Sequence, residues 1–163
     1  MNNNLSSKFD IKDLGAPNFI LAMDIKRDRE KMKISLNQRK YVETIMQRFS
    51  IQDSKPVKVP ICVGVRLFAQ QCPKTQEEEE DMSRVPYASA VGSLMYAMVC
   101  TRPDIAHVVG VLSRFMSKPR KEHWIAVKQV FRYLRDTSDY GLCYQGRSKL
   151  DRMLDIRGFV DAE

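Results

Sequence analysis

The residues of this 163-residue chain that could do chemistry are its carboxylates, histidines and cysteines, and their spacing does not assemble a complete catalytic site. Nucleotidyl transfer with two metal ions needs paired carboxylates that hold the ions roughly 4 Å apart. The sequence contains no Asp-Asp pair, no Tyr-x-Asp-Asp, no Gly-x-Gly and no Gly-Lys-Ser/Thr phosphate loop. We therefore expect no self-contained active site and no cofactor in this chain.

The four cysteines and two histidines do not form a metal-binding pattern either. Cys62, Cys72, Cys100 and Cys143 are widely separated, and no Cys-x-x-Cys occurs. Structural zinc sites need closely spaced pairs of such ligands. The N-terminus lacks a basic region followed by an apolar core, so it does not resemble a secretory signal. We expect no metal in this chain, and an intracellular location with reduced thiols.

The positive charge is concentrated in one region. The formal net charge is +7, and the isoelectric point is about 9.3. Residues 84–135 contain nine Lys/Arg against two acids, whereas the two signs balance over the rest of the chain. Such a region favours a polyanionic partner that is bound through its phosphates. The alternative is a solvated face that only keeps the protein soluble. The candidate phosphate-binding residues lie around the last helix of this region: Lys118, Arg120, Lys121, Lys128, Arg132 and Arg135.

The hydrophobic pattern predicts an α+β fold that positions these residues. Apolar residues alternate over 18–25 and again over 32–36, which predicts a β-hairpin with a polar turn between its strands. The period then changes to that of a helix up to Phe49, and Asn37 is the expected N-cap. Residues 54–84 are rich in proline and acidic side chains, and we expect a mobile surface linker there, with a solvated loop over 77–81.

Residues 85–137 are expected to form three helices, followed by two short strands over 141–145 and 154–162. The sequence Thr101-Arg102-Pro103-Asp104 separates the first two helices, with Thr101 as the expected N-cap of the second. The longest uncharged stretch, 85–101, has 17 residues and contains Pro86 and Gly92. A membrane span needs about 20 apolar residues, so we expect a buried helix there and no membrane partner.

Ten short sequences, in order along the chain, resemble the reverse transcriptase of copia-type LTR retrotransposons. The resemblance covers nearly the whole chain, and its pieces are Phe9-Asp-Ile-Lys-Asp-Leu-Gly15, Phe19-Ile-Leu-Ala-Met-Asp-Ile25, Leu36-Asn-Gln-Arg-Lys-Tyr41, Tyr87-Ala-Ser-Ala-Val-Gly-Ser-Leu-Met-Tyr96, Thr101-Arg-Pro-Asp-Ile105, Ser113-Arg-Phe-Met116, Glu122-His-Trp124, Arg132-Tyr-Leu-Arg135, Tyr140-Gly-Leu142 and Gly158-Phe-Val-Asp-Ala162.

The resemblance implies a part of a larger Pol polyprotein in four segments. Residues 1–53 would form the end of the palm, with a primer-grip-like hairpin and a helix, and residues 54–84 would be the linker. Residues 85–137 would form a basic, thumb-like helical segment, and residues 138–163 would form the start of a truncated RNase H-like domain. The chain would begin after the metal-binding aspartates of the palm, so an intact parent would supply both them and Mg²⁺.

The same resemblance implies a role for particular residues. The primer-grip-like residues would be Phe19, Ile20, Leu21, Ala22 and Met23. The helix with Gly92 and Tyr96 would follow the minor groove of the template–primer, because a glycine lets a sugar–phosphate backbone approach closely. The alternative is that Gly92 is a helix–helix contact and Tyr96 a core residue.

Two positions bear on what this chain could still do. The family usually has glycine where Ala22 stands, so a positive φ at that position would impair the grip. Asp161 matches the first of the four RNase H carboxylates, and Glu163 stands where aspartate is usual. One carboxylate cannot hold two metals, so we expect Asp161 to be a remnant and the chain alone to be inactive.

The implied partners are an RNA–DNA or DNA duplex, bound through its phosphates, and the remainder of the Pol polyprotein. An intact element would work in the cytoplasm, the nucleus or a virus-like particle. Two alternatives are a helical interaction protein without a nucleic-acid role and a degenerate relic of a retrotransposon. A third is poor folding in isolation, because a hairpin without its supporting sheet is marginal in water.

Overall fold

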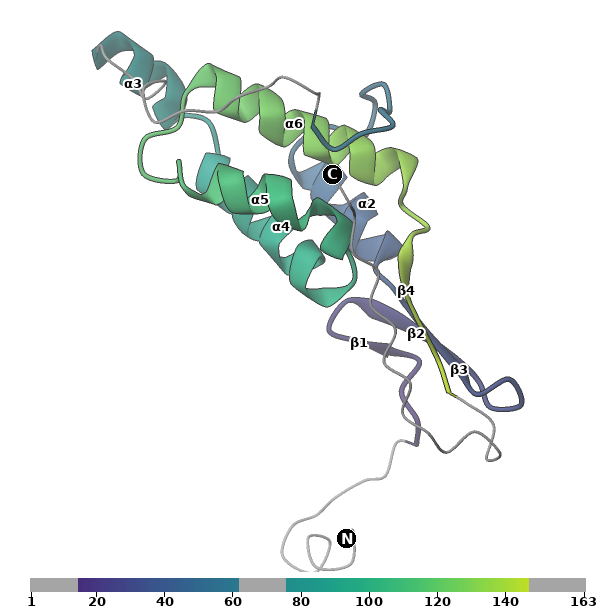
Figure 1. Cartoon of the computed structure of the whole chain (residues 1–163). Coiled ribbons are helices and arrows are strands. Elements are labelled where there is room, and N and C mark those ends of the chain that lie inside the picture. Colours follow the sequence, from purple (N-terminus) through teal and green to yellow (C-terminus); the bar gives the residue numbers. More distant parts are fainter. Residues whose placement is uncertain (1–14, 62–75, 147–163) are drawn as a thin grey trace, which may run out of the picture.

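The computed structural model of the chain describes residues 15–61 and 76–146, which form a helical bundle with a sheet that projects from one end (Figure 1). The elements, in chain order, are β1 (Phe19–Ile20), β2 (Met23–Asp28), β3 (Lys33–Asn37), α2 (Arg39–Arg48), α3 (Gln76–Ser83), α4 (Tyr87–Cys100), the 3-10 turn η2 (Pro103–Ile105), α5 (Ala106–Ser113), α6 (Lys121–Asp136) and β4 (Gly141–Gln145). The fold class is therefore mixed α+β, as predicted.

The sheet is antiparallel, in the order β1-β2-β3-β4. The predicted hairpin is confirmed for β2 and β3, where Ile25 pairs with Leu36. Its first strand starts later than the alternation indicated, because the chain reverses at Leu21 and Ala22 and makes Ile20 the partner of Met23. The strand also continues to Asp28, through residues expected in the polar turn. Both turn residues have positive φ, +48° and +58°. A two-residue turn with this geometry matches the twist of the two strands that it joins.

The core of the described residues lies between α2, α4, α5 and α6. Each of these helices turns three- and four-spaced aliphatic residues inward, and Val91, Leu94, Val109, Leu112, Val127 and Leu134 are fully buried. Met95 and Met116, which the same spacing places on the apolar stripes, are instead 38% and 37% exposed. The predicted N-cap of α2 is wrong by one residue: Gln38 takes the N-cap position without a side-chain cap, and the Asn37 side-chain oxygen accepts the Arg39 N–H at 2.6 Å from the end of β3.

A buried arginine fixes the corner between α4 and α5. Arg102 is 1% exposed, and its guanidinium donates two hydrogen bonds to the Asp104 carboxylate, at 2.9 and 2.6 Å. It also donates to the carbonyl oxygen and the hydroxyl of Thr137, at the end of α6. Thr101 does not cap the next helix as predicted; it is buried, and its hydroxyl donates to Gln38. The corner thereby connects α4, α6 and the start of α2.

Strand β4 returns the chain to the N-terminal hairpin. It pairs with β3 along five residues, from Asn37–Gly141 to Lys33–Gln145. The Asn37 amide also donates to the carbonyls of Asp139 and Tyr140, just before β4. The boundary at residue 138 stays a prediction, but this strand belongs to the same sheet as the N-terminal hairpin. The second predicted strand, 154–162, lies outside the described residues.

Part of the predicted linker is ordered. The acidic run 77–81, expected in a loop, lies in helix α3. Residues 54–59 run along α6: the Val57 N–H bonds the Arg132 carbonyl at 3.4 Å, and Lys58 pairs with Asp136 at 3.0 Å. A run of glutamates has a good intrinsic helix propensity, which the loop prediction did not weigh.

Candidate nucleic-acid interface

The solvent face of α4 carries no charged side chain. Its exposed residues recur at three- and four-residue spacing, and the helix contains neither acid nor base: they include Ala88, Gly92, Met95, Tyr96 and Val99. Val99 is 75% exposed. A Cβ built on Gly92 would meet no atom within 4 Å, so this glycine is not a helix–helix contact among the described residues. Gly92 and Tyr96 therefore lie one turn apart on an open surface.

The turn between β1 and β2 reaches this same face of α4. The Tyr96 hydroxyl donates a hydrogen bond to the Leu21 carbonyl oxygen at 2.5 Å. The Tyr96 ring also meets the edge of Tyr41 from α2, with centroids 5.1 Å apart. Leu21 itself is 70% exposed. The β1–β2 turn and helix α4, which were predicted from the sequence as primer-grip-like and thumb-like elements, therefore meet at Tyr96.

The surroundings of the Tyr96 hydroxyl disfavour its ionised form. Burial of the hydroxyl and the neighbouring Cys100 thiol both raise the pKa of Tyr96 above its ordinary value of 10.0. Tyr41, which supports it, has a pKa raised by burial, and its own hydroxyl donates to the Ser93 carbonyl at 3.1 Å. This pair of tyrosines fixes the turn against α4.

The remaining predicted grip residues surround that turn. Phe19 and Ile20 are 52% and 46% exposed, whereas Ala22 and Met23 are half-buried. The Lys40 ammonium lies 5.2 Å from the centre of the Phe19 ring and 3.4 Å from Asp24. The turn thus presents apolar side chains to solvent beside α4, and the positive φ of Ala22 meets the condition under which we expected the missing glycine to matter.

The basic residues of α6 lie on one face of that helix. Lys121, Lys128, Arg132 and Arg135 recur at seven, four and three residues, a spacing that places them on the side opposite the buried stripe. Arg132 donates from Nε to the Lys55 carbonyl at 2.5 Å, and Arg135 donates to the Ser54 carbonyl. The two arginines therefore hold residues 54–55 against α6, a contact that helix periodicity alone does not predict.

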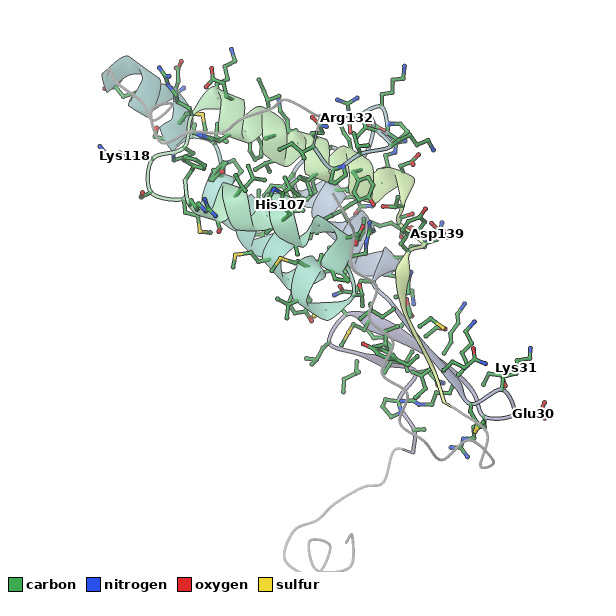
Figure 2. All side chains as sticks on the ribbon, in the orientation of Figure 1. Glu30, Lys31, His107, Lys118, Arg132 and Asp139 are labelled. Atoms are coloured by element: carbon green, nitrogen blue, oxygen red, sulfur yellow. The ribbon has the colours of Figure 1, made fainter. Side chains whose placement is uncertain are left out.

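Lys118 and Arg120 precede α6 in the connection from α5, and Figure 2 shows Lys118 far from Arg132. The Arg120 N–H donates to Nδ1 of His123 at 2.9 Å. His123 is fully buried and stacks on Phe115, with ring centroids 4.1 Å apart. This histidine is thus a packed core residue at the helix start.

The uncharged face of α4 and the basic face of α6 are two different surfaces. Both helices turn their buried stripes into the same core, so their exposed faces point away from it on separate sides. In Figure 1 the segment that follows α2 lies beyond α6, whereas the β1–β2 turn lies on the other side of the bundle, near the end of α4. The basic residues are aligned, but not beside Gly92 and Tyr96.

In residues 15–61 and 76–146, no group of three or more His, Cys, Asp or Glu side chains is placed to hold a metal ion. Asp161 lies outside the described residues. Within the same ranges, no helix is long and apolar enough to cross a membrane.

The chain is similar to parts of known proteins. It is 50% identical over 159 residues to the retrovirus-related Pol polyprotein from transposon TNT 1-94 of Nicotiana tabacum, covering 98% of this chain and 12% of that protein. The corresponding polyprotein from transposon RE2 of Arabidopsis thaliana is 31% identical over 98% of this chain and 10% of its own length. The chain thus spans about a tenth of these two polyproteins.

A third relative has a different description. Secreted RxLR effector protein 161 of Plasmopara viticola is 61% identical over 84 residues, which are 50% of this chain and 59% of that protein. No protein-family profile matches the chain. No solved structure matches it either.

Proposed function

Because this chain is a retrotransposon-derived relative, over nearly its whole length, of one segment of the copia-type Pol polyproteins, we propose that it acts as the primer-grip and thumb portion of a reverse transcriptase. In this role it binds the template–primer duplex and positions it for a catalytic site that other parts of the polyprotein supply. The observation that carries the proposal is the Tyr96–Leu21 hydrogen bond, which joins the two proposed duplex-binding elements.

The chemistry of the α4 face supports contact with a groove of the duplex. Gly92 leaves room for close approach of a sugar–phosphate backbone. Met95 and Val99 offer apolar contact to sugars, and the uncharged surface carries no acid that would repel phosphates. Contacts of this kind hold nucleic acid without reading its sequence. We expect binding that is independent of sequence. Because α4 carries no Lys or Arg, its contacts release no counterions, and the weakening of binding with salt would come from the lysines and arginines elsewhere in the chain.

A pair of glycine substitutions tests this proposal on the full chain. Gly92 and Gly110 both lie inside helices, and a Cβ at either would meet no atom within 4 Å. Gly92→Leu places a side chain on the proposed duplex face, whereas Gly110→Leu makes the same change on α5. Both should preserve or raise stability, because leucine is a better helix former than glycine.

The readout is fluorescence anisotropy with a labelled RNA–DNA hybrid at two salt concentrations. Gly92→Leu should weaken binding at least about tenfold, which corresponds to about 1.4 kcal/mol, and Gly110→Leu should bind as the unmodified chain does. Equal binding by the two variants would refute the assignment of this face, and absence of hybrid binding at low salt would refute the proposed function.

The proposed function also implies where the chain works and that it has no polymerase activity of its own. We propose that the chain alone does not polymerise, because the carboxylate pair needed for two-metal transfer is missing from its sequence. Mg²⁺ would then act with the rest of the Pol polyprotein, inside the cell or a virus-like particle. A primer-extension assay with Mg²⁺ should give no product above background; measurable synthesis would contradict this part.

A second candidate function is protein binding, favoured by the exposed apolar side chains of Leu21 and Val99 at 70% and 75% exposure. The separation of the basic face from Gly92 and Tyr96 also favours it. In that case Val99→Ser would abolish capture of a protein partner, and the hybrid would not bind at any salt concentration.

A further inference from the structure

A cavity of about 380 Å³ lies between α6 and the residues that follow α2. One wall is the outer face of α6, with Ile125, Lys128 and Arg132; the other wall includes Ser50 and Lys55. The hydrogen bond from Arg132 Nε to the Lys55 carbonyl at 2.5 Å joins the two walls. This cavity is on the basic face of α6 and separate from the Gly92–Tyr96 surface.

The cavity is strongly positive. Lys55, Lys128 and Arg132 line it, and none of its lining residues is acidic. Asp136, one turn beyond Arg132, is paired with Lys58 at 3.0 Å, so its charge is balanced. Asp53 is close in the sequence but does not line the cavity. Three cations with no acid among the lining residues attract an anion of more than one charge.

The cations keep donors available for a ligand. Arg132 uses Nε for Lys55, and its two terminal nitrogens have no hydrogen-bond partner among the described residues. A guanidinium with two free N–H groups fits the oxygens of a phosphate in a bidentate manner. The Lys128 side chain is exposed. The Ser50 hydroxyl adds a neutral donor at the rim.

The remaining wall is apolar. Ile125, in the second turn of α6, is 53% exposed, and Ile51 lines the cavity from the other side. A site that combines an anion clamp with apolar surface suits a ligand that has a charged end and a flat organic body. A volume of this size matches a single small ligand.

We propose that this cavity binds the terminal phosphate of a nucleic-acid strand, with the attached nucleoside against Ile125. A terminal phosphate monoester carries a charge of about −1.5 to −2 at pH 7, whereas an internal phosphodiester carries a single negative charge. Three cations therefore match the end of a strand better than its interior. The inference does not depend on duplex binding at Gly92 and Tyr96.

The test uses short single-stranded oligothymidylates of one length, with either a 5′-phosphate or a 5′-hydroxyl, titrated onto the full chain by fluorescence anisotropy at fixed salt. The phosphorylated strand should bind at least about tenfold more tightly, which corresponds to about 1.4 kcal/mol. Equal affinity of the two strands would overturn the proposal.

Charge-reversal variants locate the site. Lys128→Glu and Lys55→Glu, on opposite walls, should each abolish the preference for the phosphorylated strand. Lys33→Glu makes the same change in net charge on β3, outside the cavity, and should retain that preference. If all three variants weaken binding equally, only the overall charge matters and the cavity is not the site.

Two further measurements separate the sources of phosphate and the two surfaces. Inorganic phosphate should displace the strand only at concentrations far above that of the oligonucleotide; displacement at equal concentration would show a site for free phosphate and overturn the strand assignment. Gly92→Leu should leave the preference for a 5′-phosphate unchanged even where it weakens hybrid binding, and its loss in that variant would contradict a separate site.

Discussion

A Cβ atom at Gly141 would lie 2.1 Å from the carbonyl oxygen of Leu36, its neighbour across the β3–β4 pair. No side chain fits at that distance without moving the backbone. Gly141 is the first residue of β4, and it pairs with Asn37, the last residue of β3, two residues before α2 begins at Arg39. This glycine therefore allows the end of the bundle and the sheet to meet.

We predict that Gly141→Ala destabilises the protein by about 1–3 kcal/mol, the usual cost of forcing an extra carbon into a packed position. The loss follows from separation of β4 from β3. Chemical denaturation monitored by circular dichroism measures it. Gly146→Ala is the milder comparison, because its Cβ would lie 3.3 Å from the Met32 Cβ and 3.4 Å from the Met32 carbonyl oxygen, tight contacts that a shift of a few tenths of an ångström relieves. Equal stability of the two variants would contradict the predicted clash.

The turn at Leu21–Ala22 gives a prediction of the opposite sign. Ala22 has φ of +58°, a conformation that costs a residue with a Cβ roughly 1–2 kcal/mol. Ala22→Gly should remove this cost and stabilise the protein by about 1 kcal/mol. Glycine also gains conformational entropy in the unfolded chain, which reduces the net stabilisation. Ala88→Gly, on the exposed face of helical α4, is the control and should destabilise by about 1 kcal/mol. A loss of stability in Ala22→Gly would show that the turn is not strained.

These two positions show what sequence reasoning captured. The helices of the bundle followed from apolar residues at three- and four-residue spacing, since that stripe must be buried. The reversal at Leu21–Ala22 was missed, because neither residue is a usual former of a turn with positive φ and the alternation of Phe19, Leu21 and Met23 continues through it.

For the two candidate surfaces, too, the sequence predicted some features and not others. The resemblance, not helix periodicity, suggested an open position for Gly92 and Tyr96, and both are exposed on α4. Of the six predicted cations, Lys121, Lys128, Arg132 and Arg135 share one face of α6, whereas Lys118 and Arg120 precede the helix. Helix periodicity could not show that the two stripes face different directions, because that depends on how the helices pack. Nor could it show that Arg132 and Arg135 bind the carbonyls of residues 54–55, contacts between segments about 80 residues apart.

Arg102 leads to a prediction about acid stability. Burial alone would raise the pKa of Asp104, but the hydrogen bonds and charge of Arg102, with the Tyr133 hydroxyl, hold it below the ordinary 3.8. A carboxyl with a lowered pKa in the folded state contributes stability above its unfolded pKa and loses it as the pH falls through the folded value. The unmodified chain should therefore have a larger free energy of unfolding than Asp104→Asn near neutral pH, and this difference should shrink below about pH 3.8.

The measurement is denaturation of both chains across the acidic range. Asp139→Asn is the control, because Asp139 is exposed and outside the Arg102 network, so its difference from the unmodified chain should be small throughout. A difference for Asp104→Asn that stays constant down to the lowest pH would show that the ion pair contributes nothing.

His123 should make stability depend on pH in the range where histidines titrate. Burial lowers its pKa, the charge of Arg120 lowers it further, and Glu122 opposes this shift. The group is fully buried, its Nδ1 accepts the Arg120 N–H, and its Nε2 has no partner in the described part of the chain. Protonation would therefore remove an acceptor and place an unpaired charge against Phe115.

The sign of the effect follows from the lowered pKa. The unfolded chain binds a proton near pH 6.5 and the folded chain only at lower pH, so stability rises with pH across that interval. We predict that the unfolding free energy falls between about pH 7 and about pH 5 in the unmodified chain. His123→Gln should remove most of this slope, and His107→Gln, at an exposed position on α5, should retain it. If His107→Gln removes the slope instead, the histidine that titrates on unfolding is the exposed one, and the buried ring is not the source of the pH dependence.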